Sequence, residues 1–162
     1  MIWPPDSPWA PWWRTSRMIA RAMCKLAKVT DKDTIYDLGS GDGEALMTAA
    51  QEYGASGVGI EIDPVRSSVS QTRINLAKMQ GRITILRKNF FDVDISRADV
   101  IFVYLVPKAL VRLKEKFLSE LKPGTRIVSY RYEIPYLTPE ETDPVHQLYL
   151  YATPKSKKKT KE

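Results

Sequence analysis

A strand, a glycine-rich loop, a helix start and a second strand that ends in a carboxylate follow one another early in this chain of 162 residues. The strands are expected at 34–38 and 57–61, with the loop Gly-Ser-Gly-Asp-Gly at 39–43 between the first strand and its helix. This order places the loop and Glu61 at the carboxyl edge of a parallel sheet, where α/β proteins bind nucleosides. The alternative is a tight strand-to-helix turn in which Glu61 and Asp63 only cap the next helix.

The glycine spacing indicates which kind of nucleoside this loop binds. Gly39 and Gly41 permit unusual backbone dihedrals and are expected to let the chain approach the cofactor closely. A dinucleotide fingerprint requires a third glycine three residues after the second, where this chain has Glu44. A carboxylate at a helix start is a poor neighbour for a pyrophosphate, and the loop lacks the Gly-Lys-Ser/Thr ending of a P-loop. A nucleoside with a positive centre therefore fits better.

S-adenosyl-L-methionine (SAM), with its adenosine, sulfonium and methionine tail, is such a nucleoside. Glu61 is placed to accept hydrogen bonds from the ribose hydroxyls. Asp37 and Asp42 are expected to hold the ammonium group or its waters. Asn89 and Phe90, which follow the third expected strand, are expected to contact the adenine edge and face; the alternative is that Phe90 and Phe91 belong to the ordinary core.

Strand and helix patterns alternate along the rest of the chain, which predicts an α/β fold with a mainly parallel sheet. The expected strands are 34–38, 57–61, 83–87, 100–105, 126–130 and 146–152. The expected helices are 15–28, with Thr15 or Ser16 as its N-cap, and 44–53, 64–79 and 109–121.

The net charge of +6 lies mostly at the two ends of the chain. Five basic side chains oppose one aspartate in residues 1–28, and five lysines oppose one glutamate in residues 155–162. We therefore expect one domain over 1–154 and a solvated, disordered basic tail over 155–162. Such charge runs also favour weak contact with nucleic acid.

The remaining composition bears on the cellular context. The lone Cys24 cannot form an internal disulfide, so a reducing cytoplasm is expected. No apolar run is long enough to span a bilayer, and the start of the chain is not typical of a signal peptide. We also expect the protein to be a monomer.

Over nearly its whole length, the chain resembles class I, seven-β-strand SAM-dependent methyltransferases. Within them it is similar to small archaeal protein-lysine methyltransferases and to the related eukaryotic mitochondrial lysine methyltransferases. The matching segments are 36–43, 58–61, 89–95 and 121–129. The resemblance implies a Rossmann-like, seven-stranded, mainly parallel sheet with helices on both faces, preceded by an N-terminal helix.

The N-terminal segment Pro-Trp-Trp-Arg-Thr at 11–15 is similar to the Pro-Tyr-x-Pro-Thr segment of the same subfamily. The likeness implies that Thr15 lies near the methionine end of the cofactor, although Trp12 and Arg14 depart from the pattern and an N-cap role for Thr15 stays open. The tryptophans of this region are expected to form an aromatic lid, a partner surface or simply a packed N-terminal arm. They are Trp3, Trp9, Trp12 and Trp13.

Methyl transfer from a sulfonium is an in-line displacement that depends mainly on orientation and needs no metal. A lysine acceptor must also be deprotonated, which an apolar, aromatic pocket favours. The end of the fourth strand reads Tyr104-Leu105-Val106-Pro107. Methyltransferases of adenine, cytosine or glutamine nitrogens usually have Asp/Asn-Pro-Pro-Tyr/Phe there, so this segment favours an aliphatic amine.

The candidate catalytic residues lie at carboxyl ends of strands, where a substrate approaches. Tyr104 is expected to contact both cofactor and acceptor, Tyr130 to line the acceptor pocket and Glu133 to orient the substrate. The alternative is that the tyrosines only pack at the strand ends, with their hydroxyls in water. His146 is expected to be structural. The sequence thus predicts a SAM-dependent N-methyltransferase that acts on exposed lysines of proteins. An RNA or small-molecule methyltransferase and a non-catalytic SAM-binding module are the alternatives.

Overall fold

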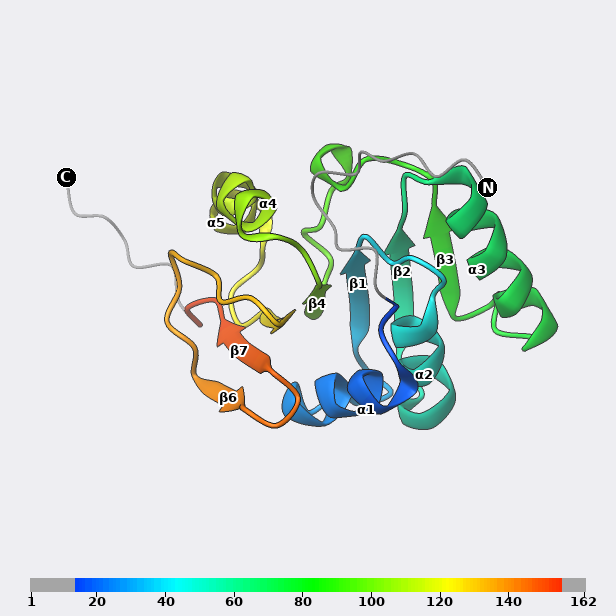
Figure 1. Ribbon diagram of the computed structural model, residues 1–162, viewed down its shortest axis with the longest axis horizontal. Helices are drawn as coiled ribbons and strands as arrows, with labels where there is room; N and C mark the ends of the chain where they lie inside the picture. Colours follow the sequence, from blue (N-terminus) through cyan, green and yellow to red (C-terminus); the bar gives the residue numbers. More distant parts are fainter. Residues whose placement is uncertain (1–13, 156–162) are drawn as a thin grey trace.

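A computed structural model, which describes residues 14–155, contains a sheet of seven strands in the order β3-β2-β1-β4-β5-β7-β6 (Figure 1). The first five strands pair in parallel, whereas β7 is antiparallel to β5 and to β6. The strands are β1 Thr34–Leu38, β2 Ser56–Ile60, β3 Ile83–Leu86, β4 Val100–Val103, β5 Arg126–Tyr130, β6 Glu141–Asp143 and β7 Leu148–Ala152. The predicted α/β class and seven-stranded, mainly parallel sheet are confirmed.

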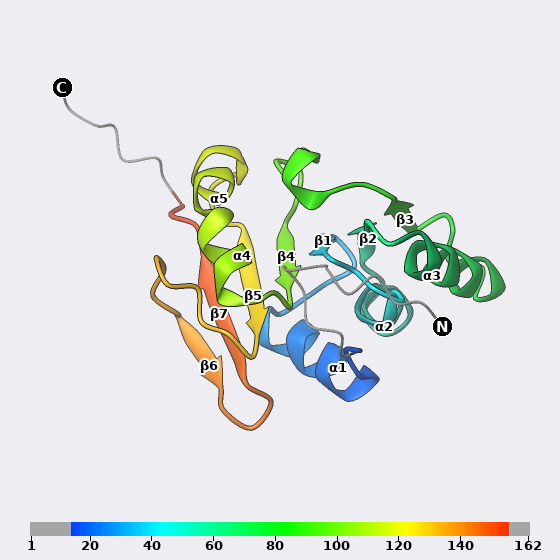
Figure 2. The same cartoon turned by 45° about the horizontal axis from the view of Figure 1, so that its top comes forward.

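Helices cover both faces of the sheet, as expected, because the central strands are apolar on both sides. They are α1 Arg17–Leu26, α2 Glu44–Tyr53, α3 Pro64–Leu76, the 3₁₀ turn η1 Phe90–Asp92, α4 Pro107–Arg112 and α5 Lys114–Glu120. Side chains of α1, α2 and α3 join one hydrophobic core, and those of η1, α4 and α5 join the other. Figure 2 shows α1 and α2 on the opposite side of β4 from α4 and α5.

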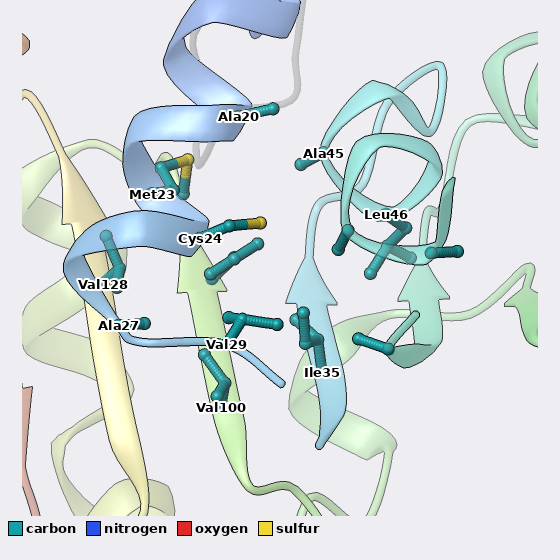
Figure 3. Close-up of a cluster of buried hydrophobic side chains, with 14 of the residues drawn as sticks. Ala20, Met23, Cys24, Ala27, Val29, Ile35, Ala45, Leu46, Val100 and Val128 are labelled. Carbon is teal, nitrogen blue, oxygen red and sulfur yellow. The ribbon is translucent and has the colours of Figure 1, made fainter. Parts of the chain in front are cut away.

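The predicted N-terminal helix is α1, and it brings one side of the core together. Its N-cap is Ser16, whose Oγ accepts a hydrogen bond of 3.2 Å from the Ile19 backbone N–H. Met23 and Cys24 face the sheet on successive positions of its apolar stripe and pack near Ile35 of β1 (Figure 3). This packing fixes the start of the described chain beside the carboxyl edge of β1.

The expected helix at 109–121 is wrong in detail. Pro107 begins α4, because its fixed φ suits a first helical turn. The chain then leaves α-helical geometry at Leu113, whose N–H donates to the carbonyls of both Ala109 and Leu110. The result is two short helices, α4 and α5, in place of one.

The C-terminal part also differs from the expectation. Strand β6 was not expected, since its three residues are polar and show no apolar alternation. Strand β7 begins at Leu148 rather than at 146, because Gln147 has φ +57 and ends the ladder. His146 lies in the turn between β6 and β7, where its Nδ1 is 2.7 Å from an Asp143 carboxylate oxygen. This local contact agrees with a structural role for His146.

The predictions for the tryptophans at 3, 9, 12 and 13 and for residues 156–162 of the tail lie outside the described residues. Across the described part of the chain, none of the helices has the length and apolar character that crossing a membrane requires.

Candidate active site

A cavity of about 350 Å³ lies where β1 and β4 end, beside α1 and the start of α2. Its volume lies within the range of small-molecule sites, roughly 300–1,000 Å³. Its position beside the central strand, where the strand order reverses, is the usual ligand position in open α/β sheets. The wall is formed by Arg14, Thr15, Met23, Asp37, Gly39, Ser40, Gly41, Asp42, Glu44, Ala45, Arg66, Val69, Val103 and Tyr104.

The glycine loop has the conformation that its sequence predicts. Gly39, Gly41 and Gly43 have φ of +80, +57 and +83, in the left-handed region that glycine adopts without strain. The N–H groups of Gly39 and Ser40 both donate to the Ile60 carbonyl, at 2.8 and 3.0 Å, so the loop is tied to the end of β2. The loop thereby brings backbone to the cavity wall.

Glu61 holds this loop from the neighbouring strand end. Its Oε2 accepts a hydrogen bond of 2.8 Å from the Gly41 N–H, and its Oε1 accepts one of 2.9 Å from the Asp63 N–H. The side chain is buried and is not part of the cavity wall. Each carboxylate oxygen retains a lone pair for a further donor, and the contact with the ribose hydroxyls stays a prediction.

Asp37 is the most perturbed carboxyl group of the site. It lies on the face of β1 that α1 and α2 cover, and within residues 14–155 no hydrogen bond to its carboxylate is found. Burial, together with the negative charges of Glu61 and Asp42, raises the pKa of Asp37 to about 7. A cationic ligand group in the cavity would therefore meet a buried carboxylate that lacks a partner.

Arginines surround the other two acidic residues of the wall. Asp42 pairs with Arg14, whose Nε is 2.6 Å from Oδ2, and with Arg73, whose Nη1 is 3.2 Å from the same oxygen. Glu44 pairs with Arg73 and, at 3.0 Å, with Arg17. Burial alone would raise the pKa of Glu44, but these two arginines outweigh it and lower that pKa. The negative charge of Glu44 is thus balanced by arginines, and the Oδ2 atom of Asp42 is already paired with Arg14 and Arg73.

The predicted adenine contacts do not reach the cavity. Phe90 is buried in the core beneath α4 and α5, and Asn89 caps η1 by accepting a hydrogen bond of 3.0 Å from the Phe91 N–H. Neither residue belongs to the cavity wall. Their contact with adenine stays a prediction, and it requires the ligand to extend past Glu61 toward the end of β3.

The three candidate catalytic residues differ in their position relative to the cavity. Tyr104 forms part of the wall, and its ring centroid lies 4.5 Å from that of Tyr130, which stands behind it. Glu133 is exposed and does not line the cavity. The structure therefore brings Tyr104 and Tyr130 together and leaves Glu133 apart.

Sequence reasoning missed several residues around the cavity. Thr15 does line the wall, but Arg14 and Arg66 do so as well. Arg73 approaches Asp42 and Glu44 from α3, two helix turns after Arg66, and nothing in the local sequence marks it as their partner. The available signal was the pair of acidic residues Asp42 and Glu44 at the helix start, with no basic residue close to them in sequence, since partly buried carboxylates require cationic partners.

The residues of the cavity fit SAM. The buried Asp37 carboxylate suits the ammonium of the methionine part. Ser40 and Tyr104 both line the wall, and their hydroxyl oxygens are buried without a hydrogen-bond partner among the described residues, which is unusual for buried polar groups. Met23, Ala45 and the other apolar wall residues provide surface for its uncharged parts. In the described residues, no group of His, Cys, Asp and Glu side chains is arranged to hold a metal ion.

Comparison with known proteins agrees with this assignment. The model of the ANTKMT methyltransferase domain family matches residues 37–141. A protein-lysine N-methyltransferase of Saccharolobus islandicus is 39% identical over 158 residues, which cover 93% of this chain and 96% of that protein. The adenine nucleotide translocase lysine N-methyltransferase of Mus musculus is 30% identical over 65% of this chain, and the match spans 46% of the mouse protein.

A solved structure is similar over the whole fold. An RNA methyltransferase of Salinibacter ruber, crystallised with S-adenosyl-L-homocysteine, has a TM-score of 0.86 and 32% identity. The match covers 91% of this chain and 97% of that protein. The cofactor of the present protein is SAM, and the chain belongs to the family of the ANTKMT methyltransferase domain and is a SAM-dependent methyltransferase.

Proposed function

We propose that this methyltransferase acts on lysine side chains of proteins. The observation that carries the proposal is the match with the Saccharolobus islandicus protein-lysine N-methyltransferase, which extends over nearly all of both chains. Because the match includes the ends of β4 and β5, the region where an acceptor approaches lies within the aligned part. The mouse relative, which is also named as a lysine N-methyltransferase, adds support over a shorter match.

The acceptor side of the cavity supports an aliphatic amine. Tyr104 stands at the end of β4, where methyltransferases of planar amino groups usually place the Asp or Asn that grips the amino group. Leu105 is fully buried, and Val103 lines the wall beside Tyr104. An apolar, aromatic wall favours the neutral form of a lysine side chain, because desolvation lowers the pKa of an amine.

In this reaction the chain mainly positions its ligands. SAM, when bound, supplies an electrophilic methyl group on its sulfonium. Asp37 is available to pair with the ammonium of the methionine part, while the glycine loop and Glu61 fix the backbone against the ligand. Tyr104 and Tyr130 limit the directions from which an amine can approach. Orientation of this kind accounts for most of the acceleration in such displacements.

RNA is a second candidate acceptor. The Salinibacter ruber protein, similar over 91% of this chain, is described as an RNA methyltransferase. The lysines at 155–161 also favour contact with a polyanion. These two observations make RNA the acceptor that an experiment must separate from protein.

The test is methylation of a proteome from the source organism with isotopically labelled SAM. The extract is divided and treated with ribonuclease or protease before the label is measured, and labelled peptides are analysed by mass spectrometry. The proposal predicts a signal that survives ribonuclease, disappears with protease and maps to lysine side chains. Asp37→Ala, which removes the carboxylate from the cavity, provides the background. Label that ribonuclease removes, with none on lysine, would establish RNA as the acceptor and end the lysine proposal.

The cellular location is proposed from composition. A single cysteine, Cys24, is buried against α2 and the sheet. We propose a reducing cytoplasm on this basis. Fractionation of source cells, with this protein followed by antibody, tests it: recovery of the protein outside the cytoplasmic fraction contradicts the proposal.

A further inference from the structure

Arg131 has an unusual backbone conformation next to the acceptor side of the cavity. It directly follows β5 and has φ +69, a region that residues other than glycine rarely adopt. Its N–H donates a hydrogen bond of 2.8 Å to the Gln147 carbonyl, just before β7. In Figure 2, β4, β5 and β7 lie side by side at this point of the sheet. The residue is therefore held in place by the end of the β5–β7 pair.

The left-handed conformation determines where the guanidinium lies. Successive residues of a strand point to opposite faces, so an extended residue 131 would point away from the face of Tyr130. Instead, the guanidinium carbon lies 5.5 Å from the ring centroid of Tyr130 and 5.7 Å from that of Tyr104. These distances are within the range of cation–π attraction, about 6 Å. Arg131 thus lies over the rings of both Tyr130 and Tyr104, and Tyr104 is part of the cavity wall.

The positive charge of Arg131 has no carboxylate within salt-bridge distance among the described residues. Within residues 14–155 it forms no salt bridge. The titratable groups that raise the pKa of Arg131 are Tyr130, Tyr104 at the end of β4, and Tyr132. The charged groups of the cavity wall are Arg14, Asp37, Asp42, Glu44 and Arg66. Asp42 and Glu44 are paired with arginines and burial raises the pKa of Asp37, so the positive charge of Arg131 is not offset by an ion pair among the described residues.

We propose that Arg131, held over the Tyr104–Tyr130 ring pair at the cavity wall, is a positioning residue of methyl transfer that disfavours the protonated form of the acceptor amine. The inference deepens the proposed function and rests on lysine being the acceptor. A lysine ammonium must release its proton to water before the nitrogen lone pair is available to the methyl group. A nearby guanidinium raises the free energy of the ammonium but not that of the neutral amine, so it favours the reactive form.

The test compares pH profiles of the single-turnover rate at saturating SAM, with the labelled protein from the proteome experiment as acceptor. Arg131→Gln removes the charge, and Arg131→Lys keeps it. Two charges on the order of 8 Å apart, partly screened, shift a pKa by roughly 0.5–1 unit. For Arg131→Gln we expect the midpoint of the profile to rise by this amount, the rate at pH 7.5 to fall about three- to tenfold, and the rates to converge at high pH. Arg131→Lys should keep the wild-type midpoint.

Two further variants separate this role from a contribution to folding. Arg131→Gly removes the charge but suits the positive φ, so it should unfold at the same temperature as wild type or higher while showing the shifted profile. Arg97→Gln, an exposed arginine before β4 at the opposite edge of the sheet, should leave both properties unchanged. A rate that Arg131→Gln lowers equally at every pH, with an unchanged midpoint, overturns the inference. If wild type labels no lysine, it is instead the proposed function that fails.

Discussion

The Glu61 carboxylate and the Gly41 backbone N–H, from two neighbouring strand ends, are joined by a hydrogen bond of 2.8 Å. The same carboxylate accepts a second hydrogen bond from the Asp63 N–H. Glu61, which the sequence predicts to contact the ligand, therefore also supports the loop that lines the cavity. Both roles are compatible, because a carboxylate offers about four acceptor positions.

Replacing Glu61 by Gln should weaken both the loop and cofactor binding. The amide keeps one acceptor oxygen and presents NH₂ to a backbone donor at the other position. Hydrogen bonds to charged groups are worth about 1.5–3 kcal/mol, so we expect the free energy of unfolding to fall by roughly this amount. Urea denaturation measures it, and calorimetry should show SAM affinity at least tenfold lower. Asp63→Asn, which retains an N-cap side chain for α3, should change stability by only a few tenths of a kcal/mol. Equal effects of both variants would contradict this role.

The central part of the fold was predictable from sequence. The bounds of β1, α2 and β5 agree with the expectation, because apolar strands with a glycine loop between them give a strong local signal. The parallel order follows from the alternation of strands and helices. Strand β6 and the division at Leu113 were not predictable, since they depend on pairing with β7 and on tertiary packing.

Sequence reasoning selected some of the residues that line the cavity but not the arginines that pair with its acidic side chains. Asp37, the loop and Tyr104 line the cavity, whereas Glu61 does not. Arg73, in contrast, reaches Glu44 from a helix that is distant in sequence. The burial of Phe90 depends on α4 and α5. The positive φ of Arg131 has no local signal, because this conformation is typical of glycine or asparagine.

Arg73 should contribute to stability in a pH-dependent manner. The pKa of Glu44 is lowered by Arg73 and Arg17 against the effect of burial. A lowered pKa in the folded state stabilises the protein above the unfolded value of 4.5, and this contribution is lost as pH falls through the folded value. Because the pair is partly exposed, we expect Arg73→Gln to lower the free energy of unfolding by about 1–2 kcal/mol at pH 7, with the difference narrowing below pH 4.5.

The control for Arg73 is Arg21→Gln, which breaks the more exposed pair with Glu52. Surface pairs contribute little, so this variant should show no measurable change. Urea denaturation of both variants at pH 7 and pH 3.5 makes the comparison. A loss for Arg73→Gln that is as large at pH 3.5 as at pH 7 would show that the ion pair is not its cause.

Asp37 should make the SAM-free protein less stable as pH rises. The folded pKa is raised to about 7 from 3.8, chiefly by burial. Between these values the folded state binds a proton that the unfolded state has lost, so the free energy of unfolding decreases with pH across this window and levels off above it. Across this pH window the free energy of unfolding of wild type should fall by a few kcal/mol relative to that of Asp37→Asn, which does not titrate. The expected fall is on the order of 1.4 kcal/mol per pKa unit. A difference that stays constant from pH 4 to pH 7 contradicts the assignment.

The same titration should govern cofactor binding. If the ionised Asp37 pairs with the SAM ammonium, affinity rises with pH up to about 7 and then levels off, with proton release on binding below that pH. Isothermal titration calorimetry in buffers of different ionisation enthalpy measures both quantities. Asp37→Asn should bind more weakly and without this dependence. Parallel pH profiles for the two proteins would place the ammonium elsewhere in the cavity.

The Tyr104 hydroxyl should contribute to ligand binding while lowering the stability of the SAM-free protein. The hydroxyl is buried in the cavity wall and has no hydrogen-bond partner in the described part of the chain. Tyr104→Phe should therefore raise the free energy of unfolding of the SAM-free protein by about 1 kcal/mol, because an unsatisfied buried group is removed. The same change should lower kcat/KM about five- to tenfold, since a ligand hydrogen bond is lost.

Tyr136→Phe is the matched control, because its hydroxyl already has a partner. It donates a hydrogen bond of 2.8 Å to the Leu110 carbonyl of α4, and the residue lies outside the cavity wall. Removing the Tyr136 hydroxyl should lower the free energy of unfolding by about 1 kcal/mol and leave kcat/KM unchanged. We therefore expect Tyr104→Phe to raise the free energy of unfolding and Tyr136→Phe to lower it. Only Tyr104→Phe should change kcat/KM. A Tyr104→Phe protein that is destabilised like Tyr136→Phe, with unchanged kcat/KM, would mean that the Tyr104 hydroxyl serves the fold rather than the reaction.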